Sequence, residues 1–274
     1  MENKTNRVER GFGKNMKKSI LGLVMISLLL VSVVSASMLI YPNDNAKANS
    51  KAPDNSEKIS VSDSGDWGLE RVDYVHYAKG SKPGSGGHGG GGSGDSGTSS
   101  CYQLTGYQWK SFPENYVINP TGSGLSSDFV TSAISSAAET WDAKTNANLF
   151  GSYTVDTNAQ VSLDGKNSVV FGNYPQAGVI GVTSVWRTRK GKQIVEFDVM
   201  LDTDFTWGDA NANPALMDVQ NIATHELGHA LGLDDIYSSG CKDVTMYGYS
   251  GNGETSKRTL EQADITGLQQ MYGL

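Results

Sequence analysis

The chain has 274 residues, and 38% of them are hydrophobic, which is enough to build one substantial domain with shorter accessory segments. This composition excludes a chain that is disordered throughout. The formal net charge is −7 and the sequence carries no basic patch, so a nucleic-acid partner is not expected.

The N-terminal segment has the features of an export signal. A lysine-rich stretch at residues 14–18 precedes an apolar run at residues 20–41, and the small-x-small sequence AKA follows at residues 46–48. We expect residues 1–48 to be a signal peptide, cleaved at its end or earlier, after Ala36. The apolar run is also long enough to cross a bilayer, so an uncleaved signal anchor is the alternative. In both cases the rest of the chain lies outside the cytoplasm.

The polar sequence of residues 49–79 predicts a spacer, which ends in a stretch with some strand character. The sequence WGLERVDYVHY at residues 67–77 alternates partly in polarity and could form an edge strand. It is either a short segment that docks on the following domain or a loosely ordered stretch near the membrane, and we favour the second, with His76 at the surface. Residues 80–100 hold ten of the chain's 33 glycines, interleaved with serine, which predicts a flexible linker.

Residues 101–274 are expected to form one α+β domain. A strand ending in proline is followed by an amphipathic helix, then by several short β-rich runs, and then by two more helices. This order predicts a mixed twisted sheet with one helix behind it, an active-site helix beneath it and a C-terminal helix. The expected elements are strands at 116–120, 161–163, 168–172, 179–187 and 193–202, and helices at 127–144, from Asn213 and Pro214 onward, and from about Thr259.

The segment THELGHALGLDD carries the clearest chemical signal. His225 and His229 are four residues apart, so on a helix they share a face and can reach one metal ion, while the adjacent Glu226 can position a water. Gly232 follows three residues later and permits a sharp turn, after which Asp235 can return as a third ligand. This arrangement is typical of zinc hydrolases.

Here the sequence resembles the matrixins, metzincin metalloproteases whose zinc site has the pattern HExxHxxGxxH followed by a Met-turn. This chain carries an HExxHxxGxxD variant, with Asp235 where most matrixins have histidine, and VTMYGY places Met246 as the Met-turn residue. EFDVMLDTDFTW at residues 196–207 is similar to the family's strand and loop before the active-site helix. LEQADITGLQQMYG at residues 260–273 is similar to its closing helix. The resemblance covers about residues 101–274.

The resemblance implies a metzincin fold and a secreted zinc endopeptidase that acts on protein or peptide substrates. Zinc would be held by His225, His229 and Asp235, and Glu226 would be the general base. Residues 49–79 are expected to be a spacer, with a short pro-segment as the alternative, and we expect the enzyme to be a monomer.

The resemblance also bears on the substrate pocket and on further metal ions. The segment after the Met-turn walls the substrate pocket in metzincins, which assigns Tyr247 and Tyr249 to that wall. Met200 stands where vertebrate matrixins often place a structural-zinc histidine, so a second zinc is not expected. A calcium site is suggested by the acidic residues before Trp207, although alternating aspartates are often only a solvated edge; these residues are Asp198, Asp202 and Asp204.

Two other functions are compatible with the sequence. The chain could be a membrane-anchored or surface-displayed binding module on a metalloprotease scaffold, although such a module would be expected to have lost Glu226. It could also be a zinc hydrolase of a non-protein amide. The two cysteines, Cys101 and Cys241, lie near the ends of the domain, and in an exported protein they favour a single disulfide. An inhibitory zinc-binding cysteine is the alternative, but its usual PRCGxPD context is absent.

Overall fold

The computed structural model describes residues 56–57, 68–81 and 101–274. The expected signal segment at residues 1–48 and the linker sequence at 82–100 lie outside the described residues. Within the described part, no helix has the length and apolar character needed to cross a membrane.

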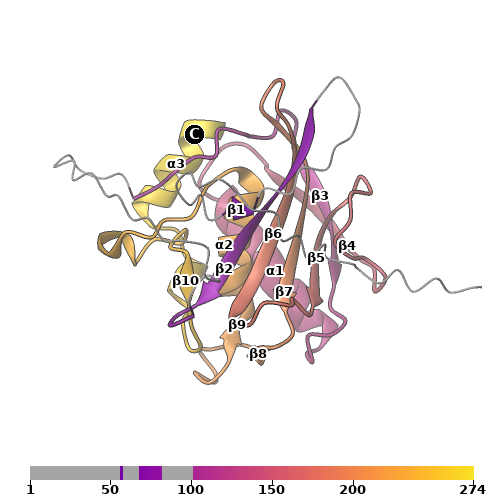
Figure 1. Cartoon of the computed structure of the whole chain (residues 1–274), viewed down its shortest axis with the longest axis vertical. Helices are drawn as coiled ribbons and strands as arrows, with labels where there is room; N and C mark the ends of the chain where they lie inside the picture. Colours follow the sequence, from indigo (N-terminus) through magenta and orange to yellow (C-terminus); the bar gives the residue numbers. More distant parts are fainter. Residues whose placement is uncertain (1–55, 58–67, 82–100) are drawn as a thin grey trace, which may run out of the picture. The chain divides into compact units, whose positions relative to one another are not determined.

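A mixed sheet forms the framework of the domain, in the order β1-β2-β6-β7-β5-β3-β4 (Figure 1). Strands β3, β4, β5 and β7 pair in parallel, whereas β6 runs antiparallel to β7 and to β2, and β10 adds to β2 in parallel. The strands are β1 Ser56–Glu57, β2 Leu69–Ala78, β3 Glu114–Asn119, β4 Phe150–Val155, β5 Asn167–Gly172, β6 Val179–Thr188, β7 Gln193–Asp202, β8 Trp207–Gly208, β9 Met217–Asp218 and β10 Tyr249–Ser250.

The helices are α1 Ser127–Asp142, α2 Val219–Leu231 and α3 Gln262–Tyr272, with short 3-10 turns at Ser239–Cys241 and Ser256–Arg258. Helix α1 begins where the Ser126 side chain accepts a hydrogen bond from the backbone N–H of Phe129. Its apolar face packs on α2 and on the sheet in one continuous core, and the Trp141 indole N–H donates to the carbonyl of Thr224. In Figure 1, α1 and α2 lie behind the strands. The predicted α+β architecture is confirmed.

Several predicted boundaries are wrong for identifiable reasons. Residues 161–163 form no strand. The edge strand beside β3 is instead β4, whose FGSYTV sequence gives little signal because most of its side chains are exposed. Helix α2 does not begin at Asn213 and Pro214. Residues Met217–Asp218 instead pair with Trp207–Gly208, and Asp218 then caps the helix by accepting from Asn221 N–H.

The prediction for residues 67–77 differs most from the structure. The expected loose order is wrong, because Leu69–Ala78 forms the ten-residue strand β2, which pairs with β6 along nearly its whole length. Its side chains are buried on both faces between Val72 and Tyr77. Burial on both faces explains why the hydrophobic alternation of the sequence was only partial.

The predicted disulfide is present. Cys101 is bonded to Cys241, 140 positions later in the chain, so the inhibitory-cysteine alternative is wrong. The bond ties the start of the domain to the segment that follows the HExxHxxGxxD motif. Cys241 packs there with Ile236 and Val244.

Candidate metal centre and active site

Helix α2 presents His225, Glu226 and His229 to the inside of the domain. All three side chains have 0% exposure, and the two imidazole Nε2 atoms lie 3.2 Å apart because residues four apart share a helix face. Helix α2 is buried on nearly every side, between the sheet and α1, which holds these side chains in fixed positions.

Gly232 ends α2 and turns the chain back toward the two histidines. Its φ of +103° lies in the left-handed region, and a Cβ at this position would collide with the carbonyl oxygen of Tyr107. The chain reverses there and brings Asp235 to the imidazoles. The Asp235 Oδ1 atom lies 3.3 Å from His225 Nε2 and 3.5 Å from His229 Nε2.

These three atoms fit a metal ion. Ligand atoms about 2.0–2.1 Å from a tetrahedral zinc lie about 3.3–3.4 Å from one another, and the observed separations are 3.2, 3.3 and 3.5 Å. Asp235 Oδ1 is buried and has no hydrogen-bond partner among the described residues. A buried carboxylate oxygen without a partner costs free energy unless a cation satisfies it.

A second layer of hydrogen bonds orients the three side chains. The Nδ1 atoms of His225 and His229 lie 2.8 Å and 3.0 Å from the carbonyl oxygens of Thr245 and Leu233, which favours protonation at Nδ1 and leaves Nε2 with a free lone pair. The other carboxylate oxygen of Asp235 accepts from the hydroxyl of Tyr237 at 3.0 Å.

The neighbouring Asp234 is placed differently. One of its carboxylate oxygens accepts from the backbone N–H of Asp235, and the other accepts from the Gln103 amide, both at 3.0 Å. Asp235, and not Asp234, therefore shares a site with the histidines, as the spacing from Gly232 predicted.

Charge and burial shift the acidity of the two carboxyl groups in opposite directions. Burial would raise the pKa of Asp235, but the imidazoles of His229 and His225 hold it well below its usual range, so it is a carboxylate. Burial raises the pKa of Glu226 to about 7, against the opposing effects of His229 and of the hydrogen bond from Thr183. Thr183 on β6 donates to Glu226 Oε2 at 2.6 Å and so fixes the carboxyl group.

The turn at Thr245 and Met246 lies beneath the motif. Met246 has 0% exposure, and its sulfur is so close to α2 that any side chain at Gly228 would collide with it. The backbone N–H groups of Thr245 and Met246 donate to the carboxylate of Asp264 on α3, at 2.9 and 3.2 Å. No pattern in the sequence identified this role of Asp264. It anchors the turn whose carbonyl at Thr245 orients His225.

A cavity of about 520 Å³ lies beside this turn, and both Tyr247 and Tyr249 line it. The Nζ of Lys257 donates to the carbonyls of both tyrosines, at 3.1 Å to that of Tyr249, although Lys257 is only 1% exposed. The pocket role of the two tyrosines stays a prediction. The other lining residues are Lys79, Gly80, Ser81, Lys242, Asp243, Glu254 and Ser256.

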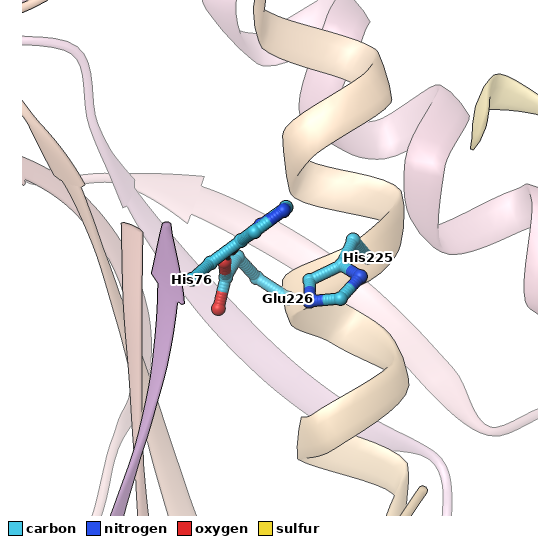
Figure 2. A group of neighbouring side chains, drawn as sticks. All are labelled: His76, His225 and Glu226. Atoms are coloured by element: carbon cyan, nitrogen blue, oxygen red, sulfur yellow. Dashed lines mark hydrogen bonds and ion pairs between the residues drawn. The ribbon is translucent and has the colours of Figure 1, made fainter. Parts of the chain in front are cut away.

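The prediction that His76 lies at the surface is wrong. His76 has 0% exposure, its Nδ1 lies 3.1 Å from Glu226 Oε1, and its ring centroid lies 3.8 Å from that of His225. Figure 2 shows His76 reaching from β2 toward His225 and Glu226 on α2. Local sequence could not reveal this contact, because it joins residues 150 positions apart.

Most carboxylates of the acidic residues before Trp207 accept hydrogen bonds from other groups of the protein. Asp198 accepts from the Ser168 hydroxyl at 2.5 Å and from Ser162 N–H at 2.9 Å, and Asp202 accepts from the backbone of Asp204 and Tyr174. Among the described residues, neither cluster of metal-ligating side chains includes them. The calcium site therefore stays a prediction. Met200, at the position considered for a second zinc, is buried on β7.

Comparison with known proteins agrees with this geometry. Residues 108–273 match the model of the family described as matrixin. Human matrix metalloproteinase-25 is 28% identical over 179 residues, 63% of this chain and 31% of that protein. Human matrilysin is 37% identical over 76 residues, which are 28% of this chain and 27% of that protein. Human neutrophil collagenase is 38% identical over 77 residues, which are 28% of this chain and 15% of that protein. The chain thus spans less than a third of the length of these relatives. Because the family match covers more than half of the chain, the protein belongs to the matrixin family.

Proposed function

We propose that this protein is a zinc-dependent endopeptidase in which His225, His229 and Asp235 hold the metal and Glu226 is the general base. The observation that carries the proposal is the set of three ligand atoms 3.2–3.5 Å apart, one of them a buried carboxylate oxygen without a hydrogen-bond partner among the described residues. Family membership supports the same activity.

The reaction proposed is peptide hydrolysis without a covalent intermediate. Bound zinc would supply Lewis acidity, polarising the scissile carbonyl and lowering the pKa of a water toward about 7. Glu226 accepts a proton from the attacking water and returns it to the leaving amine. Thr183 holds the carboxyl group in place for both transfers. Both cysteines are joined in the disulfide, so neither offers a nucleophilic thiol.

Export is part of the proposal and rests on the sequence of residues 1–48. A cleaved signal peptide would give a secreted monomeric enzyme, and an uncleaved one would leave the catalytic domain anchored on the outer side of the membrane. Peptide or protein substrates fit this location, and the tyrosine-lined cavity of about 520 Å³ beside the Met-turn is the proposed pocket for a substrate side chain.

The test is digestion of casein by the purified chain with zinc, with a chelator, and with zinc added back. We expect hydrolysis to stop in the chelator and to return with zinc. Activity that persists in fully demetallated protein would contradict the proposal. Failure to cleave casein, together with zinc-dependent hydrolysis of small non-peptide amides, would instead favour an amidase.

The ligand assignment gives a matched pair of variants. Asp235→Ala should weaken zinc binding by at least about tenfold, since loss of one anionic ligand leaves only two imidazoles. Asp234→Ala, one position earlier, should change zinc affinity little because its carboxylate contacts Gln103 and the backbone. Competition with a fluorescent zinc chelator measures both affinities. The reverse order of effects would show that Asp234 is the ligand.

A further inference from the structure

Lys257 is a buried cation behind the wall of the proposed substrate pocket. It lies in the 3-10 turn Ser256–Arg258 and is almost fully buried. We propose that Lys257 is a positioning residue that determines specificity, because it holds the pocket wall, residues 247–249, in a fixed place relative to the metal centre. This inference rests on the proposed peptidase function, since it concerns the fit of the substrate in the same site.

The charge of Lys257 is directed at the backbone of the pocket wall. Burying an ammonium group costs free energy unless hydrogen bonds satisfy it. The Nζ atom donates to the carbonyl oxygens of Tyr247 and Tyr249, the second at 3.1 Å, and lies 5.9 Å from the ring centroid of Tyr247. Burial lowers the pKa of Lys257 to about 8, against the opposing charges of Glu254 and Asp235, so the group is an ammonium at neutral pH.

The backbone of Lys257 is fastened to the helix that carries the proposed metal ligands. Its N–H donates at 2.8 Å to the side-chain oxygen of Asn221, which is fully buried on α2, one helical turn before His225. The next residue, Arg258, also binds α2, since its guanidinium donates to Asp218, which caps the helix. Lys257 thus binds α2 through its main chain and the pocket wall through its side chain. This connection sets the distance between the metal ligands and the wall.

The other side of the pocket wall is held by the segment that carries the third proposed ligand. The Tyr247 carbonyl and the Gly248 N–H belong to one planar trans peptide unit, so they point in opposite directions. The Gly248 N–H donates to the carbonyl of Ile236 at 3.0 Å, and Ile236 directly follows Asp235. The wall is therefore held between the Asp235 segment and the ammonium of Lys257. Loss of the ammonium would leave one side of the wall without its donor.

Lys257→Met tests the proposal in the full-length, zinc-loaded chain, because methionine fills a similar space without an N–H donor. Quenched fluorogenic peptides that vary one residue at a time on either side of the scissile bond identify the side chain that enters the pocket, with alanine as the reference. For the preferred peptide, Lys257→Met should raise KM about tenfold and keep kcat within about twofold, whereas the alanine peptide should keep both values.

Hydrogen exchange reports the position of the wall without any substrate. The amide of Gly248 is the probe, because Tyr249 and Ser250 are also held by their pairing with β2. This amide should exchange faster in Lys257→Met than in wild type. The control is Lys110→Met, the same substitution at an exposed lysine outside the pocket lining, which should change neither KM nor exchange.

Chemical rescue separates a lost donor from a general loss of structure. Lys257→Ala removes three methylene groups and the ammonium, which together correspond to propylammonium. Added propylammonium should restore the low KM in Lys257→Ala but not in Lys257→Met, where the methionine side chain occupies the space. Zinc affinity should keep its wild-type value in both variants, because neither substitution touches a proposed ligand.

Peptide hydroxamates distinguish this proposal from the proposed function, because they bind through zinc and are not cleaved. If no peptide is hydrolysed, but Lys257→Met lowers the preference of the hydroxamates for a large side chain over alanine, the role of Lys257 stands and the peptidase is overturned. Equal side-chain preference and equal Gly248 exchange in wild type and Lys257→Met would overturn the role of Lys257 alone. A fall in zinc affinity, or in kcat for every peptide including the alanine reference, would also overturn it, since Lys257 would then support the whole domain and not the pocket.

Discussion

Replacing Glu226 by glutamine is expected to lower peptide hydrolysis about 10²–10⁴-fold while zinc stays bound, because the amide cannot accept the proton of the attacking water. Glutamine can keep the hydrogen bonds that Glu226 makes in the site. The glutamine carbonyl can still accept from the Thr183 hydroxyl, and its NH2 group can donate toward His76 Nδ1. Rates should be compared with those of the wild-type chain at the same zinc loading.

Glu139→Gln is the matched control, since it removes an exposed carboxylate from α1 and should change neither rate nor zinc content. Zinc content measured by mass spectrometry distinguishes a lost base from a lost metal. If Glu226→Gln retains the wild-type rate with one zinc bound, Glu226 is not the general base.

Removal of the disulfide is expected to have the largest effect on stability. With Cys101 and Cys241 both replaced by serine, the free energy of unfolding should fall by about 5 kcal/mol, because a closed loop of this length restricts the unfolded chain. Zinc affinity should fall as well. The disulfide holds the segment that leads to Thr245, whose carbonyl orients His225.

Urea titration followed by tryptophan fluorescence measures this loss. Each single variant breaks the same bond, so Cys101→Ser and Cys241→Ser should each lose about as much stability as the double variant. A fall of less than about 1 kcal/mol in all three would show that packing around Cys241, and not the cross-link, holds the segment in place.

The grouping of the proposed metal ligands could be predicted from the sequence because its geometry is local. His225, Glu226 and His229 lie within two helical turns, and Gly232 fixes the turn that returns Asp235, so spacing alone determines which atoms meet. The strands β5, β6 and β7 were also predictable, since their long buried runs give a strong hydrophobic signal.

The remaining features depend on contacts between distant segments. The start of α2 was misplaced because Met217–Asp218 pairs with another segment before the helix begins, and β4 was missed because its side chains face solvent. His76 is the clearest case. A histidine in a partly alternating stretch has no local feature that distinguishes a surface side chain from one that packs against His225 and Glu226. Only the pairing of β2 with β6 decides between the two positions.

The order of β2 and α2 along the chain has a consequence for biosynthesis. Glu226 follows its partner His76 by 150 residues, so at a synthesis rate of about 5–20 residues per second the strand is made about 8–30 s before the helix. Strand β2 is therefore already available when β6 and α2 fold. The buried contact between His76 and Glu226 can therefore form as soon as α2 folds, because its partner strand has already been synthesised.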